Sequence, residues 1–91
     1  MPRPRCRRRI CGKPRANYFK PAGARVRELQ EVVLEMDEFE SIRLIDLEGI
    51  EQTEAGEKMN ISQPTLSRLL KAGRKKIADA LINGKAIRIG D

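Results

Sequence analysis

Arginine dominates the first fifteen residues, MPRPRCRRRICGKPR, which hold six arginines, one lysine, two cysteines and no acidic residue. Guanidinium groups bind phosphate oxygens through paired hydrogen bonds, so this segment has the chemistry of a nucleic-acid contact. Basic arms of this kind can follow DNA phosphates or the minor groove. The side chains suited to that contact are Arg3, Arg5, Arg7, Arg8 and Arg9. The alternative is that Arg9–Cys11 forms a strand of a small sheet, within one chain or across a dimer.

Cys6 and Cys11 bring thiol chemistry to the same segment. A structural zinc site usually needs four Cys or His ligands, and this chain has two cysteines and no histidine. One chain cannot complete such a site, so we expect no cofactor; two chains could pool four thiolates. The neighbouring arginines favour thiolate, which leaves a redox-sensitive Cys6–Cys11 disulfide as a second alternative. Our default expectation is that the two thiols are reduced and have no special role.

Charge is divided into three blocks along the chain. Residues 1–27 carry a net charge of +10, residues 28–60 carry −9 and residues 61–91 carry +5, which gives the total of +6. Acidic surfaces repel phosphate, so a polyanion is expected to meet the two ends of the chain and to avoid its centre. The second basic block needs a structural element that presents it.

A long helix is predicted for that block, from Ser62 to about Ile82. Ser62 can cap the helix, and Pro64 fits its first turn, where a missing N–H costs little. The predicted buried stripe of this helix comprises Leu66, Leu69, Leu70, Gly73, Ile77 and Leu81.

A short helix over Gln52–Met59 precedes it, and the two are joined through Asn60, which tolerates the left-handed conformation of a tight turn. Ala55 and Gly56 are small where the helices would meet, and Met59 and Ile61 are apolar on either side of the turn. This combination is typical of a helix-turn-helix. The alternative is a plain helical hairpin without a nucleic-acid role.

In a helix-turn-helix, the residues near the start of the second helix read base edges. Gln63 can bond adenine, and Arg68 can bond guanine. The complete set of residues that we expect to contact bases is Gln63, Pro64, Ser67 and Arg68. Phosphates would be bound by Ser62 and Thr65, and farther along the helix by Lys71, Arg74 and Lys75.

The elements around this pair complete a mainly α fold, a three-helix helix-turn-helix domain with short flanking β-strands. A strand is expected over 31–35, then a helix over about 37–48 with an Asp37–Glu40 capping box and a stop at Gly49. A last strand over 86–89 can pair with residues 32–34. We therefore divide the chain into a basic extended N-terminal arm, residues 1–30, and the helix-turn-helix domain, residues 31–91.

The chain resembles the UPF0251 (DUF134) family of predicted bacterial and archaeal DNA-binding proteins over almost its whole length. The matching stretches are RRICGKPRANYFKPAG, VRELQEVVL, DEFESIRLIDLEG, EAGEKMNISQPTLSRLL and KKIADALINGKAIRI. The resemblance implies a helix-turn-helix similar to region 4 of sigma-70 factors, whose recognition helix enters the major groove. It also implies a sequence-specific DNA-binding role in transcription.

Three positions in and around the first helix of the motif depart from the family pattern. Glu51 stands where a serine is common, so Thr53 is an alternative cap of a shorter helix. Asn60 replaces the turn glycine, and Gly56 replaces an alanine, which should cost about 1 kcal/mol within a helix.

The leading hypothesis is a DNA-binding transcriptional regulator that acts as a homodimer in the cytoplasm. A second hypothesis is an RNA polymerase-interacting module whose acidic centre meets a basic partner; its acids are Glu35, Asp37, Glu38, Glu40, Asp46 and Glu48. A third is a metal- or redox-sensing regulator that uses the two cysteines. We expect no enzyme activity, because no histidine or phosphate-cradling glycine loop is present, and no membrane partner, because no run of about 18 apolar residues occurs.

Overall fold

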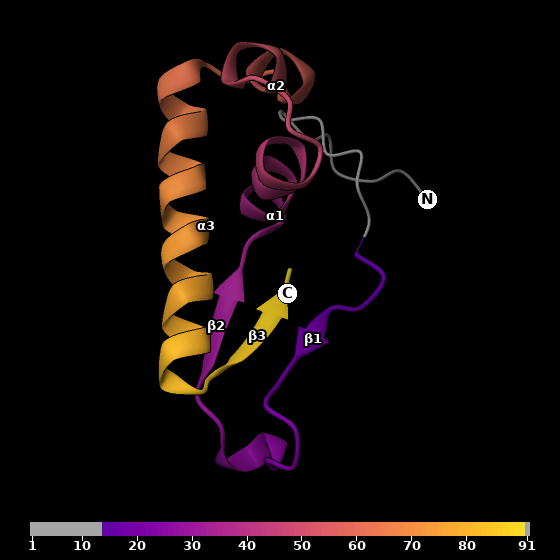
Figure 1. Ribbon diagram of the computed structural model, residues 1–91, viewed down its shortest axis with the longest axis vertical. Coiled ribbons are helices and arrows are strands. Elements are labelled where there is room, and N and C mark those ends of the chain that lie inside the picture. The colour runs from indigo at the N-terminus through magenta and orange to yellow at the C-terminus, as the bar shows by residue number, and fades with distance from the viewer. Residues whose placement is uncertain (1–13, 91) are drawn as a thin grey trace, which may run out of the picture.

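The computed structural model describes residues 14–90, which form a mainly helical fold with a three-stranded sheet (Figure 1). In chain order the strands are β1 (Tyr18–Phe19), β2 (Glu31–Leu34) and β3 (Ala86–Ile89). The helices are the short 3₁₀ turn η1 (Val26–Glu28), α1 (Met36–Ile42), the π-helical turn η2 (Arg43–Leu47), α2 (Gln52–Met59) and α3 (Gln63–Asn83).

The sheet joins the two ends of the helical region. Strand β3 lies in the centre, parallel to β2 and antiparallel to β1. Leu34 is opposite Ile89 in the parallel pair, which confirms the predicted pairing of residues 32–34 with the last strand. In Figure 1, α3 stands beside the β2 edge of the sheet and β1 lies at the other edge. Strand β1 falls within residues 1–30, so part of the expected arm pairs with the sheet.

One polar contact ties all three strands together on the exposed face of the sheet. The Glu31 carboxylate accepts hydrogen bonds from the Tyr18 hydroxyl at 2.6 Å and from the Arg88 guanidinium at 3.0 and 3.1 Å. The guanidinium also lies 4.9 Å from the centre of the Tyr18 ring, within cation–π range. Arg88 lowers the pKa of Glu31, first through its hydrogen bonds.

The first helix begins at Met36, and its N-cap lies two residues before the expected Asp37. Glu35 is the N-cap and Glu38 completes the capping box, so the predicted Asp37–Glu40 box was wrong. The physical reason is that β2 ends at Leu34, and the chain turns into the helix at the next residue. The helix continues through η2 to a stop at Gly49, which has the expected positive φ of 74°.

The turn between α2 and α3 has the predicted geometry. Asn60 adopts the left-handed conformation, with φ of 60°, and its N–H bonds back to the end of α2. Helix α2 starts at Gln52, so Thr53 lies within the helix and is not its cap; the N-cap is Glu51, which makes no side-chain cap bond. A Cβ atom at Gly56 would lie 3.1 Å from the carbonyl oxygen of Ile61. Gly56 therefore relieves a tight contact at this turn, which offsets its expected cost.

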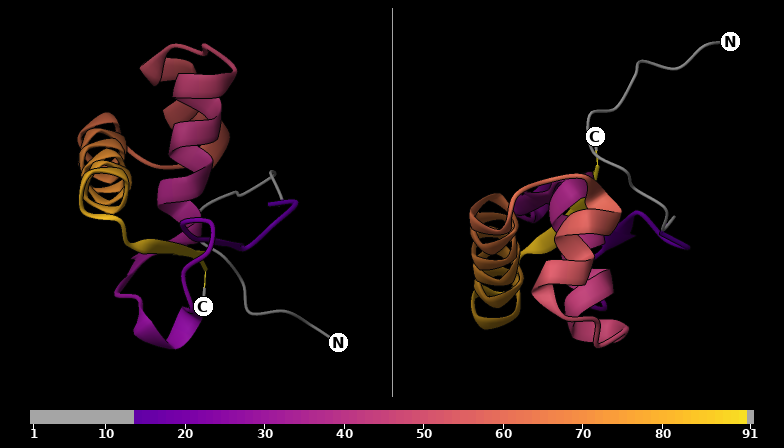
Figure 2. Two further views of the ribbon diagram at one scale, coloured as in Figure 1. Left: turned by 60° about the horizontal axis from the view of Figure 1, so that its bottom comes forward. Right: turned by 90° about the horizontal axis from the view of Figure 1, so that it is seen from above.

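The core lies where α1, η2, α2 and the first half of α3 meet. Its buried members are Leu44, Ala55, Met59, Leu66 and Leu70. Along the second half of α3, Gly73 and Ala80 are buried, but Leu81 is 75% exposed. The prediction that Leu81 belongs to the buried stripe was therefore wrong. In the left view of Figure 2, α3 lies at one side of α1 and of the sheet, so its outer side has no neighbour among the described elements.

Candidate nucleic-acid interface

Ser62 begins α3 as an N-cap, and this function occupies its hydroxyl. The Ser62 Oγ accepts from the Thr65 N–H at 3.3 Å and donates to the Thr65 Oγ1 at 2.9 Å. Pro64 has no N–H, and the Leu66 N–H bonds to the Ser62 carbonyl. At the start of the helix, the groups suited to a phosphate are therefore the Thr65 hydroxyl and the N–H of Gln63, more than Ser62 itself.

Replacing Ser62 by alanine should lower the free energy of unfolding by about 1 kcal/mol, because the Thr65 N–H loses its partner. Urea denaturation followed by circular dichroism measures this change. Ser67→Ala is the matched control, since Ser67 is a serine of the same helix that does not cap it and loses only an exposed bond of 3.3 Å to Gln52. Equal destabilisation by the two substitutions would contradict the assigned cap.

The four residues expected to contact bases lie together on the first two turns of α3. Gln63, Pro64, Ser67 and Arg68 are all exposed. The Ser67 hydroxyl donates to the Gln52 Oε1 at 3.3 Å, which links the start of α3 to the start of α2. Gln52 was missed by the sequence analysis. Only its contact with Ser67 in the folded chain identifies it.

The basic residues farther along α3 separate into two groups. Lys71 and Lys75 are exposed and continue the face of Arg68 at i+3 and i+7. Arg74 lies on the flank towards η2, where its guanidinium donates to both oxygens of Asp46 at 2.6 and 3.1 Å. A phosphate contact by Arg74 would compete with this ion pair. Lys71 and Lys75 present their ammonium groups directly to the solvent.

The Arg74 hydrogen bonds lower the pKa of Asp46 below its ordinary value of 3.8. In Arg74→Met this pKa should rise towards the ordinary value, and an NMR titration of the carboxyl carbon measures it. Because the native pKa is lowered, the stabilisation from the pair is complete above the unfolded-state pKa and is lost as the pH falls through the native one. The two proteins should therefore differ in stability near neutral pH and converge in acid.

Asp79 provides the internal control for this titration. Its pKa is lowered by hydrogen bonds from Asn83 and Lys85, which the substitution at Arg74 does not touch. A shift of both carboxyl groups in Arg74→Met would indicate a general disturbance of α3 and would contradict the local explanation.

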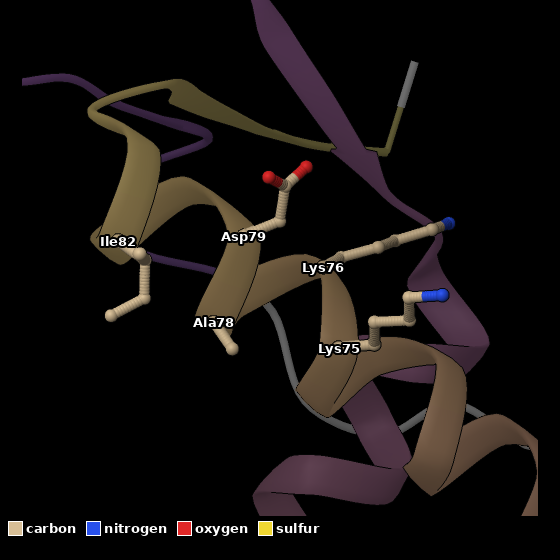
Figure 3. Close-up of a pocket in the computed structure, with 5 residues that line it drawn as sticks. All are labelled: Lys75, Lys76, Ala78, Asp79 and Ile82. Carbon is tan, nitrogen blue, oxygen red and sulfur yellow. The ribbon is translucent and has the colours of Figure 1, made fainter.

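Lys76 has a structural role, in contrast to its neighbour Lys75. Its ammonium group donates to the Val33 carbonyl at 2.7 Å and to the Glu38 carboxylate at 2.8 Å. Figure 3 shows its side chain extended away from Ala78 and Ile82, which point to the other side of α3. Lys76 therefore joins α3 to β2 and α1. The cation of this pair that lies on the exposed face of the helix is Lys75.

The acidic residues of the centre do not form one surface. Glu38 and Glu40 are 6% and 1% exposed, and they pair with Lys76 and with Arg43. The exposed acids of the motif instead lie on α2 and at its N-cap, at Glu51, Glu54 and Glu57. Since these carboxylates repel phosphate, that side of α2 must point away from a bound duplex.

The predicted arm residues Arg3, Arg5, Arg7, Arg8 and Arg9, and the thiols Cys6 and Cys11, lie outside the described residues. Within residues 14–90, no group of three or more His, Cys, Asp or Glu side chains is placed to hold a metal ion. In that same range no helix has both the length and the apolar character needed to cross a membrane.

These features define a small, mainly α-helical protein with a mixed three-stranded sheet and a capped, basic third helix. The chain belongs to the DUF134 family, described as a protein family of unknown function, whose model matches residues 1–91. No solved structure matches the chain.

Relatives of the same family share about half of the residues. A UPF0251 protein of Moorella thermoacetica is 53% identical over 98% of this chain, which spans 60% of that relative's length. A UPF0251 protein of Caldanaerobacter subterraneus is 51% identical over 98% of this chain and 75% of its own length. One from Aeromonas salmonicida is 48% identical, with 96% and 85% covered.

Proposed function

We propose that this protein binds double-stranded DNA in a sequence-specific way and regulates transcription. In this proposal, α2, the Asn60 turn and α3 form a helix-turn-helix similar to that of sigma-70 region 4, and the first turns of α3 enter the major groove. The observation that carries the proposal is the composition of one exposed face: Gln63 and Arg68 precede Lys71 and Lys75 on a helix fixed by Ser62.

The residue types on this face match the two tasks of a DNA-reading helix. Gln63 and Arg68 have side chains that form bidentate bonds with adenine and guanine edges. Lys71 and Lys75 lie one and two turns beyond Arg68, where a helix inserted by its first turns approaches the phosphate backbone. Burial of Leu66 and Leu70 against the core holds the helix so that this face stays outward.

The acidic side of α2 restricts how the duplex can dock. Glu51, Glu54 and Glu57 are exposed on α2 or at its N-cap, and phosphates placed against them would be repelled. We therefore propose that the duplex contacts α3 along the Gln63–Lys75 face and approaches α2 only near Gln52. The basic N-terminal arm, residues 1–9 above all, adds a second, sequence-independent contact.

Selection of bound duplexes from a random DNA pool tests this function. Enrichment of a defined sequence by the pure protein is the expected result, with affinity that falls steeply as salt is raised. A palindromic consensus would show that two copies bind together as a homodimer. If no sequence were enriched over several rounds, specific DNA binding by this protein would be excluded.

The exposed acids Glu51, Glu54 and Glu57 favour a second candidate function, a module that binds RNA polymerase through a basic surface. Co-purification of polymerase in the absence of DNA would distinguish it. Exchanging the three carboxylates for glutamine should abolish that interaction, and it should leave DNA selection by α3 intact.

A third candidate, metal or redox sensing by Cys6 and Cys11, has no support among the described residues. Elemental analysis of protein purified without oxygen decides it. Metal-free protein whose DNA binding is unchanged by oxidation would exclude it.

A further inference from the structure

An apolar surface lies uncovered on the second half of α3. Leu81 is 75% exposed, Ile82 is 81% exposed, and Ala78 is exposed one turn before them. Ala78 and Ile82 share one face through their i, i+4 spacing, and Figure 3 shows both side chains pointing away from Lys76. We call Ala78, Leu81 and Ile82 the α3 apolar surface. Adjacent exposed aliphatic side chains, in contrast to scattered ones, are a usual mark of contact with another protein.

The described fold leaves room beside this surface for a second helix. On the side of α3 that faces the fold, the small residues Gly73 and Ala80 are buried. On the outer side, α3 has no neighbour among residues 14–90 (Figure 2). An open hollow of about 390 Å³ lies there, lined by Lys75, Lys76, Ala78, Asp79 and Ile82, which all belong to α3. Such a hollow can receive side chains from a second helix packed against the first.

The charges of α3 favour a second copy of the same helix that runs in the opposite direction. Lys71, Arg74 and Lys75 are exposed before the α3 apolar surface, whereas the last turn of α3 contains no basic residue. The C-terminal end of a helix carries a partial negative charge. An antiparallel pair places the cations of each helix beside the C-terminal end of the other. A parallel pair would place the same cations opposite one another, which is unfavourable.

The α3 apolar surface also sets the register of such a pair. The small side chain of Ala78 allows a close approach of the two helices, so the two-fold axis passes beside it. Each Ile82 then lies opposite Lys75 of the second copy and enters the hollow there. It packs on the methylene groups of that lysine, whose ammonium group stays in water. Both copies contribute the same residues, as a two-fold contact requires.

We propose that two copies of this chain form a dimer through the α3 apolar surface, with their α3 helices antiparallel and crossing near Ala78. Gln63–Arg68 lie ten or more residues from the crossing point, about 15 Å or more along the helix. The contact therefore leaves the first two turns of α3 uncovered. The proposal does not depend on DNA binding, and it is tested without DNA.

Sedimentation equilibrium of the full chain, kept reduced, tests this dimer. The expected mass is that of two chains, with a dissociation constant measured by dilution. Ile82→Lys should raise this constant by about 100-fold, because the two-fold axis places a new cation opposite Lys75 at two positions. The new lysine lies in the last turn of α3, where a cation stabilises the helix, so the fold should be kept. Circular dichroism checks it.

Leu47→Lys is the matched control, since Leu47 is 77% exposed but lies on η2, outside the α3 apolar surface. It should change the dissociation constant by less than about 3-fold. Adding Lys75→Glu to Ile82→Lys should restore the dimer, because unlike charges then face each other in the antiparallel pair.

Three results would overturn the proposal. A mass of one chain at every concentration would show that this surface binds no second copy. Equal weakening by Ile82→Lys and Leu47→Lys would place the dimer contact elsewhere on the fold. A dimer that Lys75→Glu does not restore would exclude the antiparallel register, because in a parallel pair the two exchanged residues face their own copies.

Discussion

Replacing Lys76 by methionine is expected to lower the free energy of unfolding by about 2–3 kcal/mol, because it leaves the nearly buried Glu38 carboxylate without its cation. The same substitution removes the bond to the Val33 carbonyl. This is below the roughly 3–5 kcal/mol that breaking a fully buried ion pair costs, since Lys76 itself is partly exposed. Urea denaturation near neutral pH measures the change.

Lys75→Met is the matched control for this experiment. It removes the same charge from the next position of the same helix, but Lys75 is exposed, so stability should change by less than about 0.5 kcal/mol. A further variant, Lys76→Met with Glu38→Gln, should regain part of the lost stability, because no unpaired carboxylate remains and the amide oxygen can still accept the Glu35 N–H. Equal destabilisation by Lys75→Met and Lys76→Met would contradict the structural role of Lys76.

Replacing Arg68 by alanine should weaken binding to the selected DNA sequence by about 10- to 100-fold, or roughly 1–3 kcal/mol, if Arg68 bonds a guanine edge. Affinity for unrelated duplexes should fall much less, because those duplexes are bound mainly through phosphate contacts and not through the guanine that Arg68 bonds. Fluorescence anisotropy with a labelled selected duplex and a scrambled one measures both affinities at one salt concentration.

Two variants separate base reading from simple charge. Arg68→Lys keeps the charge but loses the planar fork, so it should lose most of the discrimination and keep most of the scrambled-duplex affinity. Lys71→Ala should weaken both duplexes alike and reduce the salt dependence by about one phosphate contact. Equal weakening of both duplexes by Arg68→Ala would show that Arg68 contacts only the backbone.

Local signals were sufficient to predict the elements around the turn. Asn60, Ser62 and Pro64 each favour one backbone conformation, so their positions fixed the end of α2 and the start of α3. The strand pairing could also be predicted, because residues 32–34 and 86–89 flank the helical region and share an apolar pattern.

Features that depend on long-range contacts could not be predicted in this way. Two overlapping capping patterns occur at the start of α1, and the end of β2 selects the one that begins at Glu35. Arg74, Lys75 and Lys76 are consecutive cations, and only the folded positions of Asp46 and Glu38 determine which two are paired. The apolar pattern also continues to Leu81, beyond the part of α3 that the core covers.

The parallel pairing of β2 with β3 has a consequence for the order in which the chain folds. These neighbouring strands are separated by roughly fifty residues, so their pairing closes a long loop and has a high entropic cost until that loop is compact. The turn between α2 and α3 involves only local contacts and can form early. Among residues 14–90, strand β1 pairs only with β3, so we expect it to join last. Amide exchange should accordingly be fastest at Tyr18 and Phe19 and slowest in the helices around Leu66.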